Sequence, residues 1–351
     1  MENTDSVYRD RRMDNIKGLL ILFVVFGHLL ELHLGLKMNK FIYTFIYLFH
    51  MPVFIFITGY FAQFDGKKLL KNMLYPYLLF QVLYLLYVNL FLQQKSSNTL
   101  LIPYWIMWYM LALSVWSAAL YFFKDMNAKK SIYSILGAFI CALLAGNCQQ
   151  IGRYLSLSRI IVFFPFFLSG YIYRKYQKVF VEWIIKKEQE RAIRLSKNKT
   201  KLHKADSSKI GFVIALLALL AIICFCWINC DIVNRNWLYE ATSYDKSNYC
   251  YGFRILHIIT AYIMLLVLYQ LIPNRRICML SKIGTSTLQI YLLHGFIIKF
   301  IDKYEFIELL KQLDTPVETI IILLIAIIIT IVLSGDIIKR ILNILLMKKK
   351  K

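Results

Sequence analysis

The stretch "DNIKGLLILFVVFGHLLELH", residues 14–33, is apolar enough to cross a bilayer, yet it contains ionisable side chains. Lys17 lies near its start and His28 lies in its interior. An ionisable group inside a membrane span is costly, so its presence there indicates a function. The position of His28 therefore raises two questions: which fold contains this span, and which other side chains reach the same depth.

Similar apolar runs recur along the whole chain. The protein has 351 residues, of which 59% are hydrophobic, and its mean hydropathy of +0.57 is too high for an ordinary soluble protein. Helical runs of roughly 20 residues can cross ~30 Å of hydrocarbon. The sequence thus predicts an all-α polytopic membrane protein, a single domain over residues 1–351 with about ten transmembrane helices. The predicted spans are 16–36, 43–63, 72–92, 104–123, 131–147, 159–174, 210–229, 253–272, 283–301 and 317–338.

The basic residues predict the orientation of these spans. The formal net charge of +22 would also suit binding to nucleic acid. However, about three quarters of the 42 Lys and Arg residues fall in alternate connecting segments, as the positive-inside rule predicts when both termini are cytoplasmic. We therefore expect a multi-pass protein of the cell membrane, bacterial in type, that contacts lipids and no nucleic acid. The tail "KKKK" at 348–351 is expected to lie against anionic headgroups.

The first apolar run is too long for the core of a signal peptide, and no small-residue cleavage site follows it, so we expect it to be retained. Two connecting segments are unusual. Residues 175–209 form a basic cytosolic loop ("KKEQERAIRLSKNKTKLHKADSSK" at its end), which we expect to be a solvated, partly helical linker. Residues 230–252 form an outer loop rich in Tyr and Trp. An interfacial aromatic belt or a platform for stacking sugars would explain that composition.

The seven cysteines follow no metal-ligand or redox spacing, so we predict no metal site. Four of them lie in or near spans, where cysteine behaves as a small hydrophobe. The sequence does not decide whether Cys230 and Cys250 form a disulfide on the outer side.

Three histidines are predicted to lie at one depth. With a rise of ~1.5 Å per residue, His28 lies roughly 18 Å from the cytosolic end of its span, and His294 about 16 Å. His50 lies about 10 Å from the outer end of the second span, which is a similar level. Glu31 shares a helix face with His28 at i+3, where a carboxylate would orient the ring of a general base. The alternative is that each histidine only forms hydrogen bonds between packed helices.

Basic residues gather at the predicted cytosolic mouth. Lys17 lies three turns before His28 on the same helix face, and Lys67, Lys68 and Lys71 precede the third span. They are either topogenic charges or ligands for the phosphates of an anionic donor.

These residues resemble motifs of the acyltransferase type 3 family of integral membrane O-acyltransferases. "DNIKGLLILFVVFGH" matches its pattern of an acidic residue, a basic residue, ten intervening residues and Gly-His, which here are Asp14, Lys17 and His28. "FHMPVFIFITGYF", "KKLLKNMLYPY" and "WIMWYMLALSVW" are similar to its spans 2 to 4. "RIIVFFPFFLSGYIYRK" and "GTSTLQIYLLHGFIIK" resemble its sixth span and its late Tyr-Leu-Leu-His span. The motifs occur in order over most of the chain.

The resemblance implies transfer of an acetyl group from acetyl-CoA, a substrate rather than a bound cofactor, to a hydroxyl of a surface polysaccharide or lipid-linked glycan. The implied partners therefore include that acceptor and other proteins of polysaccharide biosynthesis. In this chain Lys68 and Lys71 replace a pair that is more often Arg, and Lys lacks the bidentate fork that grips phosphate. The residues expected to act are His28, Glu31 and His50 in catalysis, Asp14, Lys17, Lys68 and Lys71 in donor binding, and His294, Tyr291 and Trp108 on the acceptor side.

Three functions remain open at this stage. The leading one is an O-acetyltransferase acting on capsule, exopolysaccharide or another envelope glycan, by direct transfer or through an acyl-enzyme. The second is a membrane component that assists glycan export or synthesis without acyl transfer. The third is a proton-coupled transporter that uses the same histidines as a relay.

Overall fold

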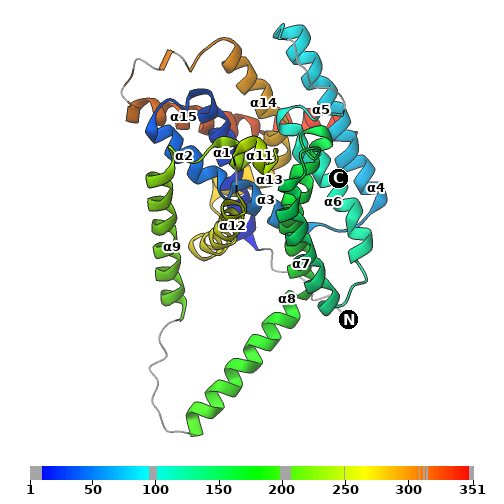
Figure 1. Ribbon diagram of the computed structural model, residues 1–351, viewed down its shortest axis with the longest axis vertical. Coiled ribbons are helices and arrows are strands. Elements are labelled where there is room, and N and C mark those ends of the chain that lie inside the picture. The colour runs from blue at the N-terminus through cyan, green and yellow to red at the C-terminus, as the bar shows by residue number, and fades with distance from the viewer. Residues whose placement is uncertain are drawn as a thin grey trace.

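The computed structural model describes residues 10–94, 101–197, 207–248, 250–307, 309–310, 313 and 315–347, and all regular structure in them is helical (Figure 1). The predicted all-α fold is thus confirmed. Across these residues, nine helical segments are long and apolar enough to cross a membrane. In chain order the helices and single helical turns are α1 (Arg11–Leu30), η1 (Glu31–His33), α2 (Lys37–Tyr47), α3 (His50–Phe61), α4 (Gly66–Leu69), η2 (Leu70–Leu74), α5 (Tyr75–Leu86), η3 (Tyr87–Phe91), η4 (Trp105–Met107), α6 (Trp108–Phe123), α7 (Ala128–Leu144), η5 (Ala145–Asn147), η6 (Tyr154–Ser156), α8 (Leu157–Lys197), α9 (Ser207–Asn229), α10 (Arg235–Tyr239), α11 (Tyr244–Ser247), α12 (Tyr251–Leu271), α13 (Cys278–Thr285), α14 (Thr287–Lys303), α15 (Thr315–Leu333) and α16 (Asp336–Leu345).

Helix α1 lies in the centre of the bundle, where α3, α13, α14 and α15 pack around it (Figure 1). Its apolar side chains, such as Ile16 and Leu20, are fully buried. Near its start, the Asn15 amide donates to the backbone oxygens of Pro273 and Arg275 and accepts from the Ser281 hydroxyl. These bonds satisfy a buried amide and fix α1 against α13, which sets the position of every later residue on α1.

The predicted span 283–301 is broken, which corrects the expectation of one continuous helix. Helix α13 ends at Thr285, and the chain bends at Ser286 before α14 begins. A Cβ added at Gly284 would lie 1.8 Å from the Asp14 backbone oxygen, so α13 approaches α1 more closely than a larger residue would allow. This contact holds α13 against α1 while α14 leaves in another direction and brings His294 into the bundle.

The second predicted span, 43–63, consists of two helices. Helix α2 ends at Tyr47, and α3 begins at His50 after Leu48 and Phe49. Pro52 lies in the first turn of α3, where a missing backbone N–H costs no hydrogen bond. The break places His50 at the start of a helix near the middle of the bundle.

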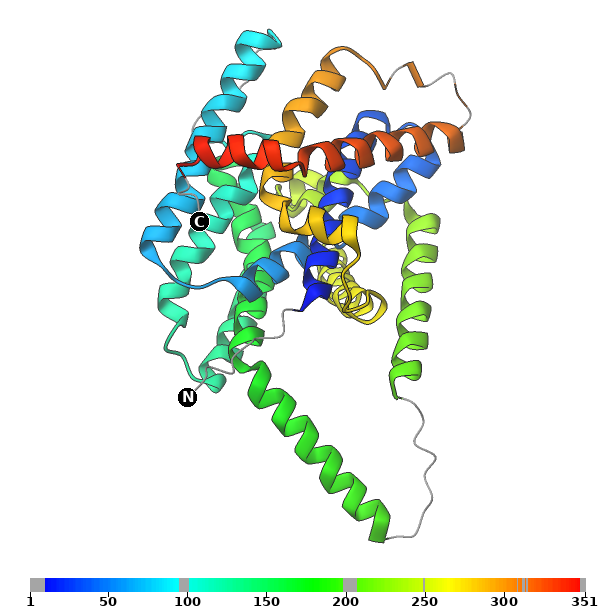
Figure 2. The same cartoon turned by 180° about the vertical axis from the view of Figure 1, so that it is seen from behind.

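The basic segment 175–209 is largely a continuation of a helix rather than a loop. Helix α8 runs for 41 residues and extends away from the bundle (Figures 1 and 2). Its sequence there is rich in Lys, Glu, Gln, Arg and Ala, which favour helix even without tertiary contacts. Residues 198–206 of this segment, and the "KKKK" tail, lie outside the described residues.

The segment 230–252 folds over one end of the bundle through the short helices α10 and α11. Both Cys230 and Cys250 are free thiols, as are the other cysteines, so the disulfide left open above is absent. Burial raises the pKa of the Cys230 thiol. This loop contributes to the interior of the bundle through Tyr239, which lies at the end of α10.

Candidate active site

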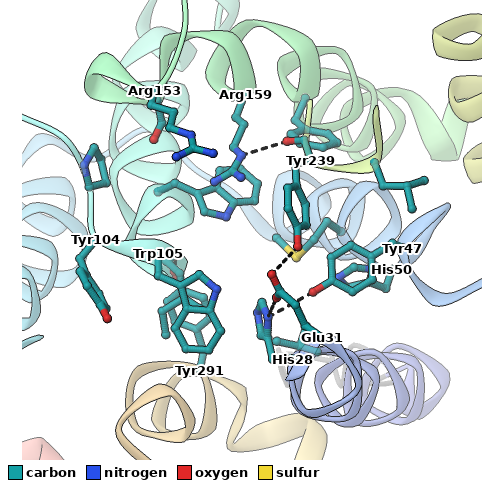
Figure 3. A pocket seen from close by; sticks show the side chains of 18 of the residues that line it. His28, Glu31, Tyr47, His50, Tyr104, Trp105, Arg153, Arg159, Tyr239 and Tyr291 are labelled. Atoms are coloured by element: carbon teal, nitrogen blue, oxygen red, sulfur yellow. Dashed lines mark hydrogen bonds and ion pairs between the residues drawn. The ribbon is translucent and has the colours of Figure 1, made fainter. Parts of the chain in front are cut away.

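A cavity of about 320 Å³ lies at the Leu30 end of α1, between α1, α2, α3, α6, α8, α10 and α14 (Figure 3). Its wall includes His28, Glu31 and His50, the three side chains predicted to be catalytic. Tyr291 and Trp108, predicted to contact the acceptor, also line it. The aromatic members of the wall are Tyr47, Tyr104, Trp105, Trp108, Phe163, Tyr239 and Tyr291.

The His28 ring is held through one of its two nitrogens. Its Nδ1 lies 3.4 Å from a Glu31 carboxylate oxygen and 3.1 Å from the Tyr47 hydroxyl. A proton on Nδ1 can be donated to the carboxylate, which leaves Nε2 as the basic nitrogen. No described residue forms a hydrogen bond with Nε2. His28 is therefore oriented as a general base with a free lone pair.

Glu31 is itself fixed by a chain of phenols. Tyr239 donates to the carboxylate oxygen of Glu31 that does not face His28 (Figure 3). Tyr43 donates to the Tyr239 hydroxyl at 2.7 Å. Burial, reinforced by the charge of Glu31, raises the pKa of the Tyr239 phenol, so it stays protonated and remains a donor. The carboxylate thus faces His28 in one orientation, and it can stabilise an imidazolium when the ring takes a proton.

The approach of Tyr47 to His28 depends on the preceding residue, Gly27. A Cβ at Gly27 would lie 2.8 Å from the Tyr47 ring, so glycine makes room for that ring. Tyr43 stacks on Tyr47 with ring centroids 4.0 Å apart. The Gly-His pair of the sequence motif therefore has a structural reason: the glycine admits the tyrosine that contacts the histidine.

The other two histidines take different positions. His50 is almost fully buried, donates from Nδ1 to the Ile46 carbonyl at 2.8 Å, and lines the cavity. His294 donates to the Ile290 carbonyl at 2.9 Å and stacks on the His28 ring at 5.6 Å between centroids. His294 is fully buried and does not line the cavity. It is a packing neighbour of His28, in contrast to the predicted acceptor-side position.

Trp105 lies next to the His28 ring in the cavity wall. Its ring centroid lies 4.5 Å from that of His28, and its φ of 33° lies in the left-handed region. That conformation costs a non-glycine residue about 1–3 kcal/mol, and such strain gathers at functional sites. The Lys299 ammonium lies 5.0 Å from the Trp105 ring and forms a 2.9 Å ion pair with Asp302.

The loop that carries Tyr239 is anchored by a buried ion cluster. Glu240 pairs with Arg254 at 2.7 Å and with His257 Nδ1 at 3.1 Å, and the side chains of Glu240 and Arg254 are about 1% and 0% exposed. Arg254 also donates to the Ala142 carbonyl, and the Ser158 hydroxyl donates to the Glu240 carbonyl. The cluster ties α10 to α7, α8 and α12 and thereby fixes its neighbour Tyr239.

The predicted donor-side residues lie elsewhere. Lys17 forms a 2.8 Å ion pair with Asp14 on the first turns of α1, roughly 16 Å along the helix from His28. Lys68 pairs with Asp65, and the backbone N–H of Lys68 lowers the pKa of that exposed carboxyl. Neither these residues nor Lys71 line the cavity. The structure therefore separates the donor-side set from the histidine set along α1.

Three further residues of the cavity wall, on the outer connecting segments and at the start of α8, were not predicted from the sequence. Tyr239, Arg153 and Arg159 belong to the wall, and Arg159 donates to the Tyr239 carbonyl at 2.9 Å. One signal was present: Arg153 and Arg159 lie at the predicted outer side, where the positive-inside rule predicts few Arg residues.

Replacing Tyr239 with Phe should lower kcat by about tenfold, since Glu31 loses one hydrogen bond from a neutral donor. The KM for the acyl donor should change little. Steady-state kinetics of the variant would measure both. Tyr154→Phe, which removes a hydroxyl from an exposed ring outside the cavity, is the matched control and should retain the parental rate. An unchanged kcat in Tyr239→Phe would contradict the role given to this phenol.

Comparisons with known proteins identify the family of this chain. The family model described as an acyltransferase domain, of the acyltransferase type 3 family, matches residues 10–335, nearly the whole chain. A segment of 59 residues is 44% identical to the nodulation protein NolL of Sinorhizobium fredii, and that match covers 16% of this chain and 16% of the relative. No solved structure matches. The family match spans the cavity, the histidines and all nine apolar segments, and this chain therefore belongs to the acyltransferase type 3 family as a helical, multi-pass membrane protein.

Proposed function

We propose that the protein is a membrane O-acetyltransferase that moves an acetyl group from cytosolic acetyl-CoA to a hydroxyl of a cell-surface polysaccharide. The acceptor would be a capsule, an exopolysaccharide or another envelope glycan. The observation that carries this proposal is the oriented His28–Glu31 pair in a cavity walled by aromatic rings. Membership in the acyltransferase family supports the reaction class.

The chemistry follows from the geometry. His28 Nε2 removes the proton of an acceptor hydroxyl, and the resulting oxygen nucleophile attacks the thioester carbonyl carbon. The tetrahedral intermediate collapses with loss of the C–S bond, and the imidazolium returns the proton to the CoA thiolate. Glu31 stabilises the imidazolium throughout. The products are an acetyl ester and free CoA.

The aromatic wall supports a sugar as the acceptor. Trp105 and Trp108 line the cavity, and the apolar faces of pyranose rings pack on indole rings. Trp105 lies against His28 itself, so a sugar stacked on it would hold a hydroxyl near the base. The donor would enter from the opposite end of α1, where Lys17 and Lys68 are paired with Asp14 and Asp65 and the exposed Lys67 and Lys71 add positive charge for phosphates.

The test compares a deletion strain with the same strain expressing the wild-type gene. Surface glycan from each is quantified and its acetyl esters are measured by NMR. Loss of the ester signals with normal polymer yield supports the transferase. Loss of the polymer itself would show instead a role in export or synthesis, and unchanged esters would reject the proposed reaction.

A further inference from the structure

The cavity wall has an excess of positive charge. Arg153, Arg159 and Lys299 line it, against a single carboxylate, Glu31. Glu31 is already engaged by His28 and Tyr239. A chamber with this balance attracts an anion, because the charges lie between low-dielectric walls that focus their field.

The two arginines differ from Lys299 in their partners. Lys299 is neutralised by its 2.9 Å ion pair with Asp302. For Arg153 and Arg159, no carboxylate of the described residues lies within ion-pair distance. Figure 3 shows both guanidinium groups pointing into the cavity from the same side.

Arg159 is held in a fixed orientation. Its Nε donates to the Tyr239 carbonyl, and its guanidinium lies over the Trp108 ring at 5.0 Å. The Tyr239 ring centroid also lies 5.8 Å from the guanidinium carbon. These contacts occupy Nε and bring two aromatic rings to the group, and they leave the terminal nitrogens for a ligand. A planar guanidinium of this kind binds carboxylate or phosphate through two parallel hydrogen bonds.

Arg159 and the base His28 line the same cavity, so one substrate molecule can contact both. Tyr239 connects the two: its carbonyl accepts from Arg159, and its hydroxyl reaches Glu31, which faces His28. The anion subsite and the base are therefore connected through Tyr239 and Glu31 in the wall of one cavity. A sugar with an acidic group on one edge of its ring would place a hydroxyl of the other edge toward His28.

We propose that Arg153 and Arg159 form an anion subsite, so that the acceptor is a negatively charged glycan. The acidic group is a carboxylate, as in a uronic acid, or a phosphate attached to the sugar. This inference rests on the proposed transferase function and specifies its substrate class. It also explains why two arginines occur on the predicted outer side, against the positive-inside trend.

The experiment uses the full protein in lipid nanodiscs with saturating acetyl-CoA, and it follows CoA release and acetyl ester formation. Three acceptors are compared: an oligosaccharide of hexuronic acid, the same oligosaccharide with its carboxyl groups reduced to alcohols, and a sugar phosphate. We expect the neutral oligosaccharide to have a kcat/KM between about ten- and a hundredfold below that of the better acidic acceptor, as loss of a charge-assisted hydrogen bond predicts. The comparison of the two acidic acceptors identifies carboxylate or phosphate as the group bound.

Arg159→Gln should raise the KM for the acidic acceptor by about tenfold or more and leave the KM for acetyl-CoA unchanged. Arg159→Lys should restore part of the loss, which separates a charge effect from misfolding. Lys246→Gln removes one positive charge from the segment 230–252, on the same outer side, without touching the cavity, and it should behave as wild type. Equal use of neutral and acidic acceptors by the wild type would overturn the anion subsite, as would a rise in the KM for acetyl-CoA in Arg159→Gln. Absence of acetyl transfer to every acceptor would instead reject the proposed function.

Discussion

Replacing His28 with Gln should lower kcat by about 10²–10⁴-fold, which is the usual contribution of a positioned general base. Gln keeps a polar side chain next to Glu31 and Tyr47 but has no basic nitrogen of comparable strength. The KM for acetyl-CoA should stay near its parental value, because in the proposed reaction His28 acts on the acceptor hydroxyl. Rates of CoA release by the purified protein in nanodiscs would measure both constants.

The matched control for this variant is His33→Gln. The His33 ring pairs with Glu318 through Nδ1 and lies outside the cavity, so its loss should lower thermal stability and leave kcat within about threefold of the parent. Similar losses of kcat in the two variants would show that the effect of His28→Gln is structural. A His28→Gln variant with normal turnover would remove His28 from the mechanism.

Glu240→Ala should destabilise the protein by about 3–5 kcal/mol, the cost of breaking a buried ion pair by removing one partner. Glu240 neutralises Arg254, and the side chains of both are almost completely buried. The variant would leave a guanidinium charge in the interior beside neutral groups such as the Ala142 carbonyl and the Tyr244 ring. Thermal or denaturant unfolding in detergent would measure the loss.

Asp231→Ala provides the control for that prediction. Asp231 also forms an ion pair at the same end of the bundle, with Lys40 at 2.9 Å, but the two side chains are 48% and 38% exposed. Exposed ion pairs contribute little to stability, so this variant should have the same melting temperature as the parent. Equal melting temperatures of Glu240→Ala and the parent would contradict the structural role of the cluster. The double variant Glu240→Ala/Arg254→Met should recover much of the stability, because it removes both buried charges.

The all-α membrane fold could be predicted from the sequence because it depends on regular geometry, and the same geometry placed three histidines at a similar level. Helix length follows from apolar runs, and depth follows from the rise per residue. Depth does not give the direction in which a side chain points. His28 and His50 face the cavity, whereas His294, at the same level, lies behind His28 with no cavity exposure. The direction of Glu31 was likewise open, and the structure turns it into the cavity, on a turn beyond the end of α1.

The loop residues of the site could not be placed from local patterns. Tyr239 reaches Glu31 because the Glu240 cluster folds α10 over the bundle, and that cluster joins residues that are far apart in the sequence. The break at Ser286 was also missed, although polar residues (Thr285, Ser286 and Thr287) lie there, and the close contact of α13 with α1 explains the bend. Both features arise from tertiary contacts that no single segment encodes.

The central claim is that acyl transfer takes place in this cavity at His28. A cryo-electron microscopy structure in nanodiscs, with an acetyl-CoA analogue whose thioester is replaced by a stable thioether ketone, tests it most directly. An acceptor hydroxyl that is hydrogen-bonded to His28 Nε2 defines the position of the attacking oxygen. The account predicts that the ketone carbon lies within about 4 Å of that position. Binding of the acyl end of the analogue outside the cavity would contradict the account, as would a His28 ring turned toward lipid.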